Sequence, residues 1–175
     1  MKFNNDKAVF TPPEATFVET ACGYRQADDI KLSVRSAALD WALQVLPEDY
    51  TSRLQGEECA YILLRARAEE SWQPEQGETI PVSLDRQQLG VLKELATLAV
   101  QTAKEEAGNV DRNYEIDSVL TDIFLPEEAD QIELGEWEAD SYKKDVFEES
   151  IANIAIGYHV VSVINDYEQR NPRQS

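Results

Sequence analysis

Apolar residues recur at helical spacing in several stretches, and the clearest stretch lies near the C-terminal end. From Lys143 to Gln169 they repeat at intervals of three and four, which predicts one long helix with two apolar stripes. The part from Ile151 to Ile164 contains no Asp, Glu, Lys or Arg. A helix that is apolar on most sides must be covered on most sides. We therefore expect it to be central in the fold or shared with another subunit.

Earlier stretches follow the same spacing. Residues 34–46 carry an amphipathic pattern that Pro47 ends. Ser83 or Asp85 can cap the next clear helix, which is expected to stop near Gly108. Asp85 has Gln88 three residues on, which fits a loose capping box. A shorter helical pattern over residues 116–124 is ended by a proline.

Two parts of the chain have weaker patterns. The apolar run within residues 56–72 suits a buried strand or a helix, and the order of its flanking charges favours the helix. Residues 79–82 are expected to be at most a short extended piece, which leaves room for a short strand pair near residues 59–84. Residues 1–32 contain Pro12-Pro13 and show no sustained periodicity, so an irregular N-terminal arm with at most one short strand is expected there.

Together these patterns predict a mainly α fold, a single-domain bundle of roughly five helices around a late central helix. The expected division is an arm over residues 1–32 followed by a helical domain over residues 33–175. At 175 residues the chain is long enough to bury a real core.

The charge of the chain restricts the classes of partner that it can bind. The chain has 34 acidic and 16 basic residues, so its formal net charge is −18. Such a chain repels phosphate backbones and anionic headgroups, and no strong basic patch offsets this. Direct binding to nucleic acid or to a membrane surface is therefore not expected.

The acidic residues are unevenly distributed. Residues 104–149 hold 16 acids and four bases, so they supply −12 of the net charge. Within them, residues 113–142 hold ten acids and no Lys, Arg or His. This acidic segment must face water or a cationic partner, because unpaired charges are costly to bury.

The acidic segment has two interpretations. It is a solvated loop whose apolar residues fold back onto the core, or it is a docking surface with Trp137 as a buried anchor. In the second case the carboxylates lie opposite Lys and Arg of a partner. The candidate partner-binding residues are Glu127, Glu128, Asp130, Glu133, Glu136, Trp137, Glu138 and Asp140.

Catalytic motifs are absent from the sequence. It contains no Gly-rich phosphate loop, no G-x-G-x-x-G, no G-x-S-x-G and no H-E-x-x-H.

The histidine and the cysteines of the sequence do not indicate a metal site. His159 is the only histidine and is predicted to be a core or interface residue. Cys22 and Cys59 have no metal-site spacing and are expected to be reduced and mostly buried. We expect neither catalytic residues nor a metal or cofactor, and a binding role rather than an enzyme.

The start of the sequence lacks the apolar core of a secretory signal, and no stretch has the length of a membrane span. A cytoplasmic location is expected.

Two function hypotheses follow, and a third stays open, an enzyme whose catalytic residues are scattered over different helices and leave no linear motif. The first is an acidic inhibitor or regulator that occupies a basic surface of a partner, such as a nucleic-acid-binding protein, by imitating the charge of nucleic acid. The second is a helical adaptor or structural subunit, a homodimer among the options, whose last helix forms the interface. That interface would be formed by Phe147, Ile151, Ile154, Tyr158 and Val161.

Overall fold

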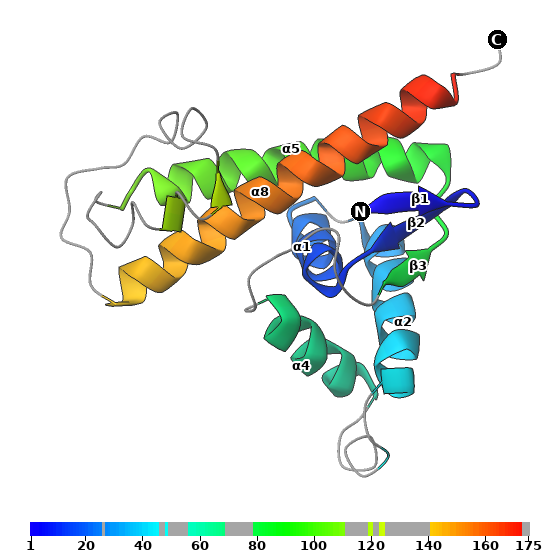
Figure 1. Cartoon of the computed structure of the whole chain (residues 1–175), viewed down its shortest axis with the longest axis horizontal. Helices are drawn as coiled ribbons and strands as arrows, with labels where there is room; N and C mark the ends of the chain where they lie inside the picture. The colour runs from blue at the N-terminus through cyan, green and yellow to red at the C-terminus, as the bar shows by residue number, and fades with distance from the viewer. Residues whose placement is uncertain are drawn as a thin grey trace. The chain divides into compact units, whose positions relative to one another are not determined.

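The computed structural model describes residues 1–25, 27–45, 48, 56–68, 79–110, 119–120, 123–124 and 141–172. Within these residues the chain has five helices and one three-stranded antiparallel sheet (Figure 1). The mainly α fold predicted from the sequence is confirmed. Contacts divide the chain into two compact units, which we call unit 1 (residues 1–96 and 159–175) and unit 2 (residues 97–158).

The sheet of unit 1 has the order β1-β2-β3 (Figure 1). Strands β1 (Lys2–Asn4) and β2 (Lys7–Phe10) form an antiparallel hairpin. Its two turn residues, Asn5 and Asp6, have φ of 48° and 62°, the left-handed values that a tight hairpin turn requires. Strand β3 (Ile80–Val82) pairs with β2. The short extended piece expected there is confirmed, and its partner comes from the N-terminal hairpin.

Helix α1 (Pro12–Gly23) follows the hairpin, so the prediction of an irregular structure over residues 1–32 is wrong. The proline at the first helical position is favourable, because that position needs no N–H donor and has the φ that proline already adopts. Glu14 at the third position accepts the Thr11 N–H at 2.7 Å, which satisfies a donor at the helix start. The proline pair thus begins a helix.

Helices α2 (Asp28–Val45) and α4 (Gly56–Ala68) pack against α1 and against each other. The helix that the apolar spacing predicts is confirmed in the first stretch, and the second stretch is helical rather than extended, as the order of its flanking charges favours. The two helices approach closely at Gly56, where an added Cβ would lie 2.9 Å from a methyl group of Leu39. A glycine at this position leaves room for that leucine.

The two longest helices, α5 (Arg86–Ala107) and α8 (Ser141–Arg170), contribute residues to both units. The predicted capping box at the start of α5 is confirmed. Asp85 Oδ1 accepts the Gln88 N–H at 2.8 Å, and Gln88 Oε1 accepts the Asp85 N–H at 3.0 Å. The predicted late helix is confirmed as α8.

The part of α8 in unit 1 is tied to its neighbours by side-chain contacts. Glu168 accepts a hydrogen bond from Lys93 of α5 at 3.0 Å. The ring of Tyr167 stacks on that of Phe3 of β1, with centroids 3.8 Å apart, and its hydroxyl donates to Asp6 at 3.2 Å. These contacts hold the hairpin and the beginning of α5 to the end of α8.

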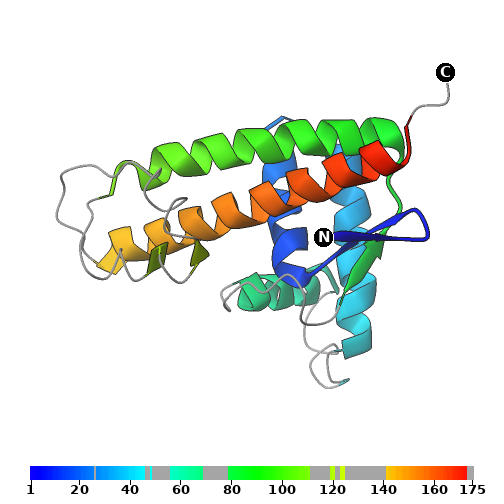
Figure 2. The same cartoon turned by 45° about the horizontal axis from the view of Figure 1, so that its top comes forward.

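Unit 2 has a core between the end of α5 and the beginning of α8, which lie side by side in Figures 1 and 2. The buried residues of this core are Val100, Ala103, Ala107, Val110, Leu120, Phe147, Ile151 and Ile154. Of the helix expected over residues 116–124, Val119, Leu120 and Ile123 are helical and Phe124 is not, and residues 116–118 and 121–122 lie outside the described residues.

Candidate functional site

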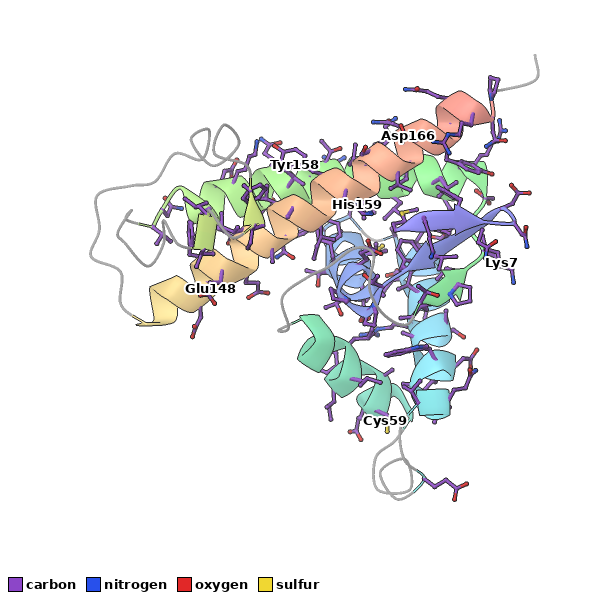
Figure 3. The ribbon with its side chains drawn as sticks, viewed as in Figure 1. Lys7, Cys59, Glu148, Tyr158, His159 and Asp166 are labelled. Atoms are coloured by element: carbon purple, nitrogen blue, oxygen red, sulfur yellow. The ribbon has the colours of Figure 1, made fainter. Side chains whose placement is uncertain are left out.

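Exposed carboxylates gather in unit 2, on the end of α5 and the beginning of α8. They belong to Glu105, Glu106, Asp145, Glu148 and Glu149. The Ser150 hydroxyl donates to Glu106 Oε2 at 3.3 Å, which joins the two helices at this point. Glu148 is labelled on α8 in Figure 3. Unit 2 therefore presents carboxylates on two helices that share one core.

Lys104 stands beside this group of carboxylates and makes a cation–π contact. Its ammonium lies 5.1 Å from the centroid of the Tyr158 ring. Tyr158 is 48% exposed. The contact therefore joins Lys104 of α5 to a partly exposed aromatic residue of α8.

The predicted partner-binding residues lie outside the described residues. This holds for all eight, namely Glu127, Glu128, Asp130, Glu133, Glu136, Trp137, Glu138 and Asp140. The described carboxylates of α5 and α8 precede and follow the acidic segment in the sequence. They belong to the same block, residues 104–149, that supplies −12 of the net charge.

The structure buries three of the five residues of the predicted oligomer interface and leaves the other two at least partly exposed. Phe147, Ile151 and Ile154 are buried in the core of unit 2, covered by residues of their own chain. A second copy would reach them only if the unit opened. Tyr158 is exposed and Val161 is half-buried, so these two alone of the five present surface. The apolar stripe is explained mainly by the core.

A cavity of about 420 Å³ lies in unit 1 among α1, α2 and α4. Its lining includes the side chains of Ala38, Ala60, Ile62 and Leu64, which are apolar. A volume of this size falls in the range of ligand pockets, about 300–1,000 Å³. No sequence motif marked this cavity, because it is formed by residues from three separate helices.

Charged groups also line the cavity. Arg35 of α2 donates from Nε to Glu19 of α1 at 2.5 Å, and the arginine side chain is 50% exposed. Glu58 of α4 is a third charged lining residue and is exposed. The cavity therefore joins an apolar wall to a charged margin.

A buried polar cluster in unit 1 is formed around Glu14, whose side chain is fully buried. The Met1 amine donates to Glu14 Oε1, and the Thr11 N–H donates to Oε2. His159 of α8 places Nε2 3.4 Å from the same Oε1 and 3.1 Å from the Met1 carbonyl oxygen (Figure 3). Because Glu14 is sealed from solvent, this cluster serves to join β1, α1 and α8. The sequence signal was the Thr-Pro-Pro-Glu start of a capping box.

We expect His159 to make the stability of the protein depend on pH. Burial, and then repulsion from the Met1 amine, lowers the pKa of His159 below its usual 6.5. The unfolded chain then binds more protons than the folded chain as pH falls through 6.5, so stability decreases there. Urea midpoints measured between pH 8 and 5.5 should fall more steeply for the native protein than for His159→Gln. Parallel curves would contradict this.

Both cysteines are free and buried, as the sequence predicts. Burial raises the pKa of Cys22 to about 11. Its thiol is therefore protonated at neutral pH and a poor nucleophile.

Three further observations concern possible ligands and relatives. Among the described residues, no three or more His, Cys, Asp or Glu side chains are grouped so that they could hold a metal ion. In the same part of the chain, none of the helices combines the length and apolarity needed to cross a bilayer. Comparison with family models, curated proteins and solved structures finds no match for this chain.

Proposed function

We propose that this protein acts in the cytoplasm as an acidic inhibitor or regulator that occupies a basic surface of a partner protein. The expected partner class is a nucleic-acid-binding protein, whose Lys and Arg are spaced to meet phosphates. Carboxylates held on a folded scaffold imitate that charge array and compete for the same surface. The proposed role is binding, without a catalytic step.

The observation that carries the proposal is the acidic block at residues 104–149. Its described carboxylates are exposed on α5 and α8, and the two helices are fixed to each other by a buried core. A rigid scaffold lowers the entropy that binding costs, so charges displayed on it bind more effectively than charges on a flexible chain. Electrostatic complementarity of this kind mainly increases association rate and specificity.

The adaptor hypothesis has less support. Three of the five residues expected in its interface are buried within their own chain. The remaining pair, Tyr158 and Val161, is a small apolar contribution compared with what a stable interface needs.

The test compares two variants that change charge equally. Glu133→Lys/Glu136→Lys/Glu138→Lys alters the acidic segment, and Asp40→Lys/Glu94→Lys/Asp166→Lys alters exposed carboxylates of unit 1. Each raises the net charge of −18 by the same six units. We expect the first to weaken capture of basic partners from host lysate about tenfold, which is about 1.4 kcal/mol, and the second to have little effect.

Salt provides an independent readout of the same experiment. Exposed charge pairs are screened over a Debye length of about 8 Å at physiological ionic strength, so partners held by carboxylates should elute as salt rises. If the two variants lose capture of basic partners equally, binding depends only on net charge, which contradicts a binding surface in the acidic segment. A partner that survives high salt and both variants would overturn the proposal.

A further inference from the structure

We propose that Glu14, His159 and the Met1 amine form a pH-sensitive latch, which holds strand β1 against α8 and releases it when His159 takes up a proton. All three groups lie in unit 1, whereas the acidic block lies in unit 2, so the latch does not depend on the proposed function. The expected change is local. Strand β1 leaves its neighbours while the rest of unit 1 stays folded.

Strand β1 is the element of the sheet that can leave with the smallest loss of contacts. It spans only Lys2–Asn4, and among the described strands it pairs with β2 alone, at the edge of the sheet. Short edge elements open with much less free energy than global unfolding requires. The described contacts of this segment with α8 lie at its two ends. His159 meets the Met1 carbonyl oxygen at one end, and Tyr167 contacts Phe3 and Asp6 at the other.

The latch has one buried carboxylate and two bases that compete for it. The Met1 amine donates to Glu14 Oε1, and His159 Nε2 lies 3.4 Å from the same oxygen (Figure 3). Glu14 is fully buried, so its carboxylate needs a partner that carries or shares a proton. The His159 side chain is 30% exposed, so a proton from water can reach the cluster through this ring.

While His159 is neutral, the cluster has no net charge. Burial lowers the pKa of the Met1 amine to about 5, and the carboxylate beside it shares the proton. The pair of Glu14 and the amine is neutral whichever of the two holds that proton. A charged His159 therefore adds an uncompensated positive charge to the closed cluster. It can also take the place of the amine as the partner of Glu14, which leaves the amine free to move into water.

Proton uptake therefore favours the released state. In the closed state, burial and then repulsion from the Met1 amine lowers the pKa of His159 below 6.5. On release the amine leaves and Glu14 remains beside the ring, so the pKa of His159 rises. The released state then binds a proton more tightly, and its population increases as pH falls through 6.5. A difference of one pKa unit between the two states changes this population about tenfold.

Other groups near His159 do not reverse this sign. Lys2, which follows the amine, is also positive and lowers the pKa of the amine further. The Met1 carbonyl oxygen lies 3.1 Å from Nε2 and raises the pKa of His159, but less than burial lowers it. On α8 itself, the sequence from Ile151 to Ile164 contains no Asp, Glu, Lys or Arg, and Tyr158 is the neighbouring titratable residue.

The experiment follows the latch by NMR in the full native chain. His159 is the only histidine, so its ring signals report its titration without overlap. The second readout is the protection from hydrogen exchange of the amides paired between β1 and β2, corrected for the intrinsic effect of pH on exchange. From pH 7.5 to 5.5 we expect this protection to fall at least about fivefold, with the midpoint of the His159 titration.

Two variants separate the latch from other contacts of the strand. His159→Gln keeps an N–H donor for the Met1 carbonyl oxygen but cannot take up a proton, so protection should stay constant over this pH range. Tyr167→Phe removes the hydroxyl that donates to Asp6 at 3.2 Å and keeps the ring. The pKa of Tyr167 is raised above its usual 10, so this contact does not depend on ionisation of the phenol. We expect lower protection at every pH and the same fall on acidification.

Urea shows whether the release is local. The effect of urea on an opening reaction scales with the surface that is exposed, so exchange of the β1 amides at pH 5.5 should depend on urea much less than exchange of the α2 amides. Equal urea dependence of the two sets would overturn the inference, because the opening would then be global. Unchanged protection between pH 7.5 and 5.5 in the native protein, or the same fall in His159→Gln, would also overturn it.

Discussion

Replacement of Ile154 by aspartate is expected to unfold unit 2. Ile154 is 1% exposed and belongs to the core formed by α5 and α8. The variant places a carboxylate among apolar side chains such as Phe147 and Val100, with no water to solvate it. The loss of packing and the buried charge together cost about 4–5 kcal/mol or more, a large part of the stability of a small protein.

Tyr158→Asp is the matched control for this variant. Tyr158 lies one helical turn further along the same stripe of α8, but it is 48% exposed. The added carboxylate stays in water there, so we expect a change of less than about 1 kcal/mol. Near-ultraviolet circular dichroism measures the loss of tertiary structure, and limited proteolysis with mapping of the cleavage sites shows whether the unfolded part is unit 2. If instead the native protein is a dimer and the Ile154→Asp variant is a folded monomer, Ile154 lies in a subunit interface and not in the core of unit 2.

Replacement of Glu14 by alanine is expected to be the second large effect. Glu14 accepts hydrogen bonds from the Thr11 N–H and from the Met1 amine, and its side chain is fully buried. Without the carboxylate, both donors remain in the interior with no acceptor from this residue. Each unsatisfied donor costs about 1–3 kcal/mol, so we expect a loss of about 3 kcal/mol in the free energy of unfolding.

Two further variants on α1 show whether burial causes this loss. Glu19→Ala removes a carboxylate that contacts the half-exposed Arg35, and such a surface pair contributes less than about 1 kcal/mol. Glu14→Gln keeps one oxygen acceptor and should fall between the alanine variant and the native protein. Urea denaturation gives all three values. Equal losses for Glu14→Ala and Glu19→Ala would contradict a special role for the buried cluster.

Much of the helical structure could be predicted from local patterns. The spacing of apolar residues predicts α2, α5 and α8, and the Asp85 and Gln88 pair places the start of α5, because these signals act within one or two helical turns. The hairpin was missed because Asn5-Asp6 lacks the glycine that usually marks such a turn. Helix α1 does not follow from the periodicity, because a proline pair more often interrupts regular structure, whereas here it begins a helix.

The mainly helical fold, the long late helix and the concentration of acid at residues 104–149 all follow from local sequence patterns. What covers each apolar face depends instead on how the helices pack. Periodicity shows that one side of α8 avoids water, and the same pattern suits a core or a subunit interface; packing against α5 places Phe147 and Ile154 in the core. The burial of Glu14 and the cavity of unit 1 were likewise decided by packing, since both are formed by residues far apart in the sequence.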